Sequence, residues 1–200
     1  IDRESIDFLE KTYPQLQGKL LRGDFLEMEL DRLFDGKAFS VIGNFPYNIS
    51  SQIFFKVIKY RELIPETVGM VQKEVAERMV STSGNRSYGI LSILLQRWYN
   101  IEYLFTVDEN VFIPPPKVKS AVIKMTRNER PDMNCNEELF IKTVKTTFNQ
   151  RRKTIRNSIK PLLRDKPFEH EFLNLRPEQL SIEQFIEFTN DLEKTLRIDN

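Results

Sequence analysis

Short apolar runs alternate with segments of helical periodicity over residues 1–127, and this alternation constrains the fold more than any other feature of the chain. The segments of helical spacing are 3–16, 51–60, 73–80 and 87–98. The strand-like runs are 18–24, 37–44, 66–72, 99–108 and 120–127. Alternation of this kind is typical of an α/β fold with a mostly parallel sheet. We predict that fold as an α/β sandwich, with the last two runs paired antiparallel at the sheet edge because little chain separates them.

The remainder of the chain contains only segments of helical periodicity. A polar, turn-rich stretch at 128–138 precedes these segments and is typical of a linker. The last helical segment begins near Ser181 and carries an apolar stripe. We therefore predict an α/β domain at 1–127, a linker at 128–138 and a small all-helical domain at 139–200.

Composition excludes several classes of protein. A single cysteine and a single histidine exclude a disulfide framework and a metal site built from several Cys and His, so we predict no metal. No apolar run approaches the roughly 18 residues that a membrane span needs, and no secretory leader is visible. We predict a cytoplasmic protein without a membrane partner. The chain starts at Ile1 rather than at Met, and we interpret it as a fragment of a longer protein.

Basic residues cluster at 151–166, although the net charge of the whole chain is only +1. Seven Lys or Arg stand there against Asp165 alone, and they are Arg151, Arg152, Lys153, Arg156, Lys160, Arg164 and Lys166. Such a run is either a solvated charged surface or a contact for phosphate groups. No acids sit four residues away to neutralise it, which favours phosphate contact. We interpret 151–164 as a basic helix.

The corner at 43–47, "GNFPY", is the most unusual turn in the chain. In open α/β sheets ligands bind at the carboxyl ends of the strands, and 23–24 and 71–72 are candidate corners of the same kind. Pro46 stiffens the turn, the Asn44 amide offers both a donor and an acceptor, and the Tyr47 ring offers a stacking platform. The corner is therefore either an ordinary buried turn with core aromatics or a grip for the exocyclic amine of a base.

Asp24 has two possible roles as well. A carboxylate just past a strand can accept a hydrogen bond from an amino group of a ligand. It can equally cap the N-terminus of a helix in the segment at 25–34. The residues alone leave both roles open.

Five blocks resemble, in order and spacing, the motifs of the ribosomal RNA adenine-N6 dimethyltransferases, which use S-adenosylmethionine. The blocks are "GD" at 23–24, "GNFPYNISS" at 43–51, "VQKEVAERM" at 71–79, "FIPPPKVKSAV" at 112–122 and "FNQRRKTIRNSI" at 148–159. The segment "RPEQLSIEQFIEF" at 176–188 resembles the C-terminal helix of the family. The basic block most resembles the bacterial small-subunit branch, the KsgA family. That resemblance implies a Rossmann-like class I methyltransferase sheet and dimethylation of two adjacent adenosines near the 3′ end of 16S rRNA in the 30S subunit.

The resemblance also implies roles for single residues. Asp24 would accept a hydrogen bond from the adenine amino group of the methyl donor. Asn44 and the carbonyl of Pro46 would accept from the target N6 amine, with Asn44 also beside the donor. Tyr47 and Phe112 would stack on the two faces of the flipped adenine. The predicted RNA contacts are Arg151, Arg152, Lys153, Arg156 and Lys160.

The chain departs from the family pattern in two places. Phe45 replaces the usual Leu, and we expect it to face the core. The Gly-rich donor-binding loop and the central first strand of the family would precede Ile1. We therefore expect an open seam in the sheet, weak or absent binding of S-adenosylmethionine and an inactive fragment. The full-length enzyme is expected to be a monomer, whereas the fragment can associate in a non-native way.

Two other functions fit parts of the pattern. The large-subunit rRNA adenine methyltransferases of macrolide resistance share most of these motifs, but the basic block and the tail at 176–188 argue against them. A non-catalytic RNA-binding assembly or transcription factor would not need the amine-orienting Asn44. We therefore predict an enzyme.

Overall fold

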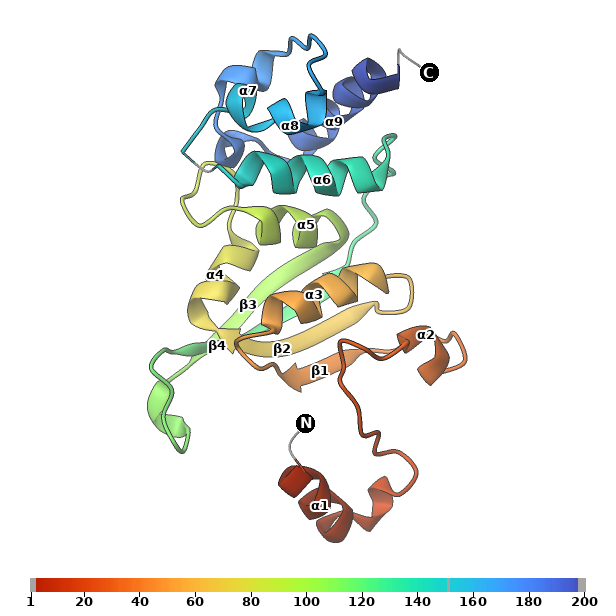
Figure 1. The fold of residues 1–200 in the computed structure, drawn as a ribbon. Helices are drawn as coiled ribbons and strands as arrows, with labels where there is room; N and C mark the ends of the chain where they lie inside the picture. The colour runs from red at the N-terminus through yellow and green to blue at the C-terminus, as the bar shows by residue number, and fades with distance from the viewer. Residues whose placement is uncertain (1–2, 151, 198–200) are drawn as a thin grey trace.

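The computed structural model describes residues 3–150 and 152–197. Its four strands are β1 (Val41–Asn44), β2 (Glu66–Gln72), β3 (Tyr99–Val107) and β4 (Ser120–Arg127). They form one sheet in the order β1-β2-β4-β3 (Figure 1). β1 and β2 are parallel, but β4 is antiparallel to both of its neighbours. The α/β class is confirmed and the antiparallel pair is present, whereas the prediction of a mostly parallel sheet is wrong. A reversing loop at 108–119 brings the chain from β3 straight into β4, so β4 must run against β3.

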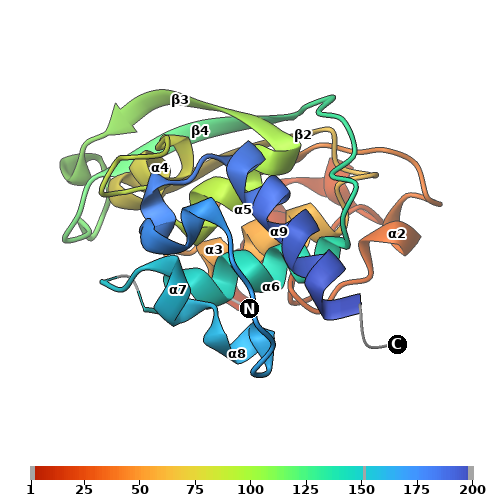
Figure 2. The same ribbon diagram turned by 90° about the horizontal axis from the view of Figure 1, so that it is seen from above.

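The helices of the α/β part are α1 (Arg3–Thr12), α2 (Leu30–Leu33), α3 (Ser50–Lys59), α4 (Lys73–Val80) and α5 (Ile90–Trp98). The last three of them pack on one face of the sheet. Figure 2 shows α3, α4 and α5 on the same side of the strands. Val71, Ile123 and Met125 are fully buried, whereas Val68 and Lys124, on alternate positions, are only half-buried. This period of two is expected of strands covered on one face.

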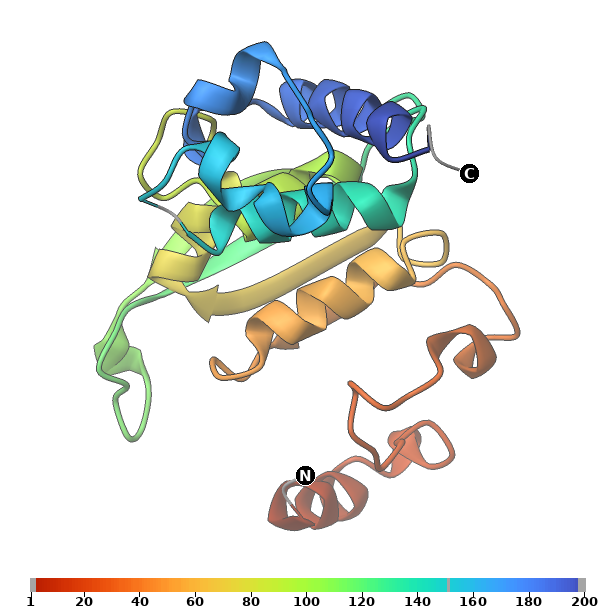
Figure 3. The same ribbon diagram turned by 45° about the horizontal axis from the view of Figure 1, so that its top comes forward.

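The segment at 18–24 does not form the predicted strand. Its backbone is a turn followed by irregular structure, and α1 lies apart from the sheet (Figures 1 and 3). A strand is stable only when a neighbour satisfies its backbone groups, and 18–24 has no such neighbour in the described part of the chain. There β1 is also an edge strand, and Ile42 on it is 82% exposed.

The predicted basic helix at 151–164 is broken into short pieces. The helices of the C-terminal part are α6 (Glu137–Phe148), α7 (Ile155–Ser158), α8 (Lys160–Leu163) and α9 (Ile182–Arg197). Short 3-10 helices occur in this part at Glu171–Asn174 and Pro177–Gln179, and in the α/β part at Pro14–Leu16 and Glu109–Val111. α6 ends before the basic residues begin. Pro161 lies in the first turn of α8, where its missing N–H does no harm but prevents α7 from continuing. Arg164 then ends α8 in a left-handed conformation, with φ of 48°.

The predicted linker is fastened to both parts of the molecule. Arg97 of α5 donates from Nη2 to the Pro131 carbonyl at 2.7 Å, and Asn190 of α9 donates from Nδ2 to the Met133 carbonyl at 3.1 Å. Met133 itself is buried in a hydrophobic cluster that runs without interruption from the sheet into the helices of the C-terminal part. The domain boundaries at 127 and 139 stay predictions.

Candidate functional site

The corner at 43–47 joins β1 directly to α3. Asn44 is the last residue of β1, and the Phe45 N–H extends the pairing by donating to the Met70 carbonyl at 3.1 Å. The Ile49 N–H donates to the Pro46 carbonyl at 3.2 Å, one residue before α3 begins. The backbone of the corner is thus held by the sheet on one side and by the start of a helix on the other.

Phe45 faces the core, as predicted, and is only 7% exposed. Its ring meets Phe54 of α3 edge to face, with the ring centroids 5.6 Å apart. The ring also lies flat against β1 and β2 at two glycines. A Cβ on Gly69 would stand 2.4 Å from Cε2 of Phe45, and a Cβ on Gly43 would stand 3.0 Å from Cε1. The buried Phe45 ring therefore anchors the corner, and it leaves room at position 69 only for a glycine.

Four residues predicted to act together line one open pocket. Asn44, Pro46, Tyr47 and Phe112 surround a volume of about 330 Å³, together with Phe45, Pro114 and Pro116. Asn44 and Pro46 are exposed, whereas Tyr47 and Phe112 are half-buried. No described residue bonds the side-chain amide of Asn44, so its donor and acceptor are available to a ligand. The structure brings these four together, and their roles toward a base stay predictions.

Tyr47 is held by a residue that the sequence did not reveal. Its hydroxyl makes a short hydrogen bond with the hydroxyl of Ser120, which is fully buried at the start of β4. The two residues are 73 positions apart. Ser120 closes the "FIPPPKVKS" block, but nothing local indicates which side chain it meets. The bond fixes the Tyr47 ring to the sheet rather than to its own turn.

Phe112 lies in the β3–β4 loop (residues 108–119), and an ion pair closes the base of that loop. The Asp108 carboxylate lies 3.2 Å from the Lys119 ammonium and accepts from the Asn110 N–H at 3.1 Å. The Asn110 N–H, followed by Lys119, lowers the pKa of Asp108 below its ordinary value. Further along, the Phe112 N–H donates to the Glu109 carbonyl at 3.3 Å. The base of the loop is thus more firmly bonded than its tip.

Asp24 does not line the pocket of Asn44 and Tyr47. Its Oδ1 accepts from the Leu26 N–H at 2.8 Å and closes a local turn, so of the two roles left open by the sequence, helix capping is not observed. The turn is held to α3 by Lys56, whose Nζ donates to the Leu26 carbonyl at 2.7 Å and to the Met28 carbonyl. Burial, ahead of the nearby Lys59, lowers the pKa of Lys56.

The predicted corner at 71–72 lies at the same end of the sheet as the corner at 43–47. Gln72 is the last residue of β2, and α4 begins directly after it. The Lys73 N–H donates to the Lys119 carbonyl at 2.9 Å, which joins this corner to the β3–β4 loop. Gln72, Lys73 and Lys119 line a second shallow pocket of about 310 Å³.

The basic cluster is less uniform than the sequence indicates. Arg152, Lys153 and Lys160 are exposed, and Arg151 lies outside the described residues. Arg156 forms a two-pronged ion pair with Glu169, at 3.2 and 3.1 Å, which raises the pKa of Arg156. The interpretation of an unneutralised run is therefore wrong for this arginine, because its partner is 13 residues away rather than four.

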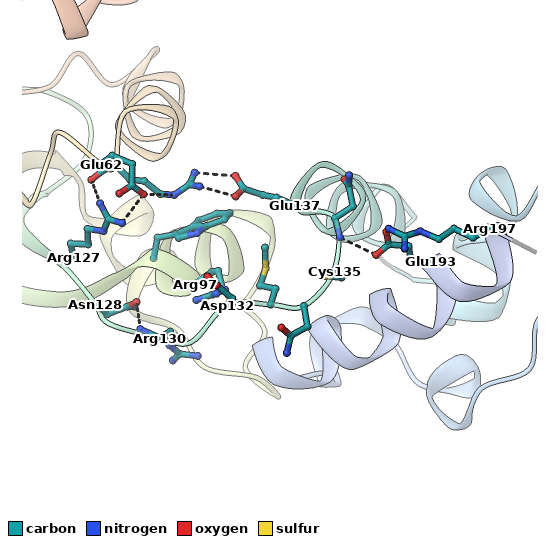
Figure 4. A pocket seen from close by; sticks show the side chains of 15 residues that line it. Glu62, Arg97, Arg127, Asn128, Arg130, Asp132, Cys135, Glu137, Glu193 and Arg197 are labelled. Carbon is teal, nitrogen blue, oxygen red and sulfur yellow. Dashed lines mark hydrogen bonds and ion pairs between the residues drawn. The ribbon is translucent and has the colours of Figure 1, made fainter. Parts of the chain in front are cut away.

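A larger cavity, of about 620 Å³, lies at the opposite end of the sheet, and none of the predicted site residues line it (Figure 4). It is rich in arginine, but carboxylates compensate most of that charge. Arg61 makes a two-pronged pair with Glu137 of α6, at 2.9 and 2.7 Å. Arg127 at the end of β4 pairs with Glu62 at 2.6 Å. The first pair joins the segment between α3 and β2 to the helical part, and the second joins that segment to β4.

Two negative findings concern the described residues, 3–150 and 152–197. No helix among them combines the length and the apolar character required to cross a membrane. They also contain no group of three or more His, Cys, Asp or Glu side chains placed to hold a metal ion.

Comparison with known proteins gives consistent matches over nearly the whole chain. The sequence model of the family described as "Ribosomal RNA adenine dimethylase" matches residues 2–194. The chain is 58% identical to "Ribosomal RNA small subunit methyltransferase A" of Bacteroides thetaiotaomicron, over 98% of this chain and 74% of that protein. The protein of the same name from Flavobacterium johnsoniae is 55% identical, over 96% of this chain and 74% of that protein.

Solved structures show the same fold. A dimethyladenosine transferase from Plasmodium falciparum superposes with a TM-score of 0.77, at 23% identity, over 98% of this chain and 80% of that one. The 23S rRNA methyltransferase ErmE gives a TM-score of 0.60, at 20% identity, over 94% of this chain and 78% of that one. These matches confirm the predicted Rossmann-like methyltransferase fold.

Proposed function

Because the chain belongs to the ribosomal RNA adenine dimethylase family, we propose that it dimethylates N6 of two adjacent adenosines near the 3′ end of 16S rRNA. One structural observation supports this proposal most. Two half-buried aromatic side chains, Tyr47 and Phe112, line a single open pocket together with the amide of Asn44, which no residue of the described part of the chain bonds. Aromatic faces offset the loss of stacking when a base leaves its helix, by ~1–3 kcal/mol per base.

The pocket provides what this methyl transfer requires from the protein. An adenine amine is a poor nucleophile because its lone pair is delocalised into the ring. The amide oxygen of Asn44 and the carbonyl of Pro46 accept hydrogen bonds from the amine and turn its lone pair outward. Pro46 can do so because the Ile49 N–H occupies only one of its two lone pairs. Positioning of this kind replaces a general base.

The proposed methyl donor is S-adenosylmethionine, which supplies an electrophilic methyl group. Asp24 fits the adenine end of this donor, because it is exposed and only its Oδ1 is engaged, by Leu26.

The proposed partner is the small ribosomal subunit in the cytoplasm. Arg152, Lys153 and Lys160 are the exposed basic residues that we assign to phosphate contact. The relatives named as small-subunit methyltransferases favour this substrate over the large subunit. The likeness to ErmE concerns the fold alone.

Methylation of small subunits that lack the modification, with S-adenosylmethionine present, tests the role of Asn44. We expect Asn44→Ala to reduce the rate by about 10²-fold or more, as the loss of one preorganised polar contact does elsewhere. Asn48→Ala is the matched control, because Asn48 is an exposed residue of the same turn that does not line the pocket. An undiminished rate in Asn44→Ala would remove Asn44 from the mechanism.

A further inference from the structure

The tip of the β3–β4 loop presents apolar side chains to solvent beside the pocket. Ile113 is 100% exposed and Val111 is 67% exposed. The alternate residues, Phe112 and Pro114, line the pocket instead. The loop therefore has two faces at this point, one toward the candidate base site and one toward solvent.

Packing within the chain does not explain these exposed side chains. The loop projects from the body at the left of Figures 1 and 3. Large apolar side chains are also exposed along β3 and at the far end of the loop, at Leu104 (44%), Phe105 (55%) and Val118 (43%). Several exposed apolar side chains on a projecting loop and its flanking strand indicate contact with another molecule.

We propose that Ile113 is a wedge that fills the gap left in the RNA stack when the target adenosine rotates into the pocket. This inference rests on the proposed function. A base that leaves its stack exposes the apolar faces of its neighbours, and aliphatic side chains occupy such gaps in other nucleic-acid complexes. Lys117, exposed on the same loop, is placed to meet a flanking phosphate.

The place of Ile113 beside the pocket favours RNA as the occupant. Phe112 has extended backbone, with φ of −104° and ψ of 150°. Successive side chains of extended backbone point to opposite sides, so Phe112 lines the pocket while Ile113 stays on the outer side of the loop. The RNA strand that delivers a flipped base to the pocket therefore passes next to Ile113.

Fluorescence of 2-aminopurine at the target position of an RNA hairpin tests the wedge without a need for the methyl donor. This base brightens when it leaves the stack. We expect Ile113→Ala to lower the flipped fraction and hairpin affinity about tenfold, the factor to which 1.4 kcal/mol corresponds. Ile113→Met, which keeps the apolar bulk, is expected to restore most of the signal. Leu33→Ala is the matched control, because it removes a partly exposed aliphatic side chain on α2, away from the β3–β4 loop.

A short single-stranded RNA separates the wedge from the proposed function. No gap opens in that RNA, so wild type and Ile113→Ala are expected to bind it equally. Wild type that binds neither RNA would refute the proposed function itself. An equal flipped fraction of the hairpin base with wild type and with Ile113→Ala would overturn the wedge alone. An effect of Ile113→Ala on intact subunits but not on naked hairpin would also overturn it, because the tip would then contact a ribosomal protein.

Discussion

At the residue scale, one large ring determines which neighbours the corner can have. Phe45 stands where the family usually has Leu, and its ring lies directly on two backbone positions of adjacent strands, Gly43 and Gly69. A side chain on Gly69 would overlap the ring. Phe45 and Gly69 are therefore a matched pair, although 24 residues separate them in the sequence.

We expect Gly69→Ala to lower the free energy of unfolding by roughly 1–3 kcal/mol, because the new Cβ overpacks the site. Adding Phe45→Leu should recover most of that loss, since the shorter side chain leaves room. Urea denaturation of the two single variants and the double variant measures this coupling. Gly89→Ala is the control, because a Cβ there makes an ordinary contact of 3.9 Å. Equal losses in Gly69→Ala and in the double variant would contradict the pairing.

The residues of the pocket differ in how well the sequence predicts them. Asn44, Pro46 and Tyr47 stand together in one short motif whose side-chain chemistry is unusual for a turn, and Phe112 stands in a second. Ser120 could not be predicted in the same way, because its role depends on a bond to Tyr47 across 73 positions. Local patterns indicate which residues are unusual, but only the fold shows what holds them.

At the element scale, the base of the β3–β4 loop has a defined pH dependence. The pKa of Asp108 is lowered, first by the Asn110 N–H and then by Lys119. A carboxyl group whose pKa is lower in the folded state stabilises that state above its ordinary pKa, about 3.9. The contribution is lost as the pH falls through the folded value. The loop base should therefore be intact through the neutral range and loosen only in strong acid.

An NMR titration of the Asp108 carboxyl tests this expectation. In wild type its midpoint should lie below the ordinary value. Lys119→Ala should raise the midpoint only part of the way, because the Asn110 N–H, the larger cause, remains. A midpoint that Lys119→Ala leaves unchanged would show that the ion pair does not form in solution.

The broken basic segment makes a graded prediction for RNA binding. Arg152→Ala with Lys153→Ala should reduce the slope of log affinity against log salt by about 1–2, at 0.7–0.9 per lost phosphate contact. Arg156→Ala should change the slope less, because Glu169 already pairs with that arginine. Filter binding or anisotropy over a salt series measures both. Equal slopes for wild type and the double variant would refute the assignment to phosphate contact.

Secondary structure was predictable where the local sequence pattern alone determines it. The strands at 66–72 and 120–127 and the helix at 73–80 match their sequence patterns residue for residue. The run at 18–24 resembles a strand, yet a strand also requires a hydrogen-bonded neighbour, which periodicity does not reveal. The helical pattern at 151–164 conceals a proline and a left-handed residue, and these divide it.

At the scale of the whole molecule, Trp98 reports on the junction between the two parts. It is the only tryptophan of the chain and is 8% exposed. The Arg61 guanidinium lies over its ring at 4.9 Å, and Phe140 of α6 meets the ring edge to face. Because one hydrophobic cluster spans this junction, we expect the sheet and the C-terminal helices to unfold together.

Hydrogen exchange tests this cooperativity. The slowest amides of β4 and of α9 should report the same opening free energy, equal to that from the urea transition of Trp98 fluorescence. Arg61→Ala should lower all three values by about 1–2 kcal/mol through loss of the pair with Glu137, a figure reduced for partial exposure. Exchange of α9 by an opening that leaves β4 protected would instead make the two parts separate folding units.

The hydrogen bond between the hydroxyls of Tyr47 and Ser120 makes one side of the pocket rigid and leaves the other side movable. Ser120 on β4 is paired with Gln72 on β2 and with Val107 on β3. Through its hydrogen bond to Ser120, Tyr47 is therefore fixed to the centre of three paired strands. Phe112 sits near the tip of a loop that is secured mainly at its base. If a base stacks between the two rings, as proposed above, it therefore enters and leaves by displacement of Phe112, while Tyr47 stays in place.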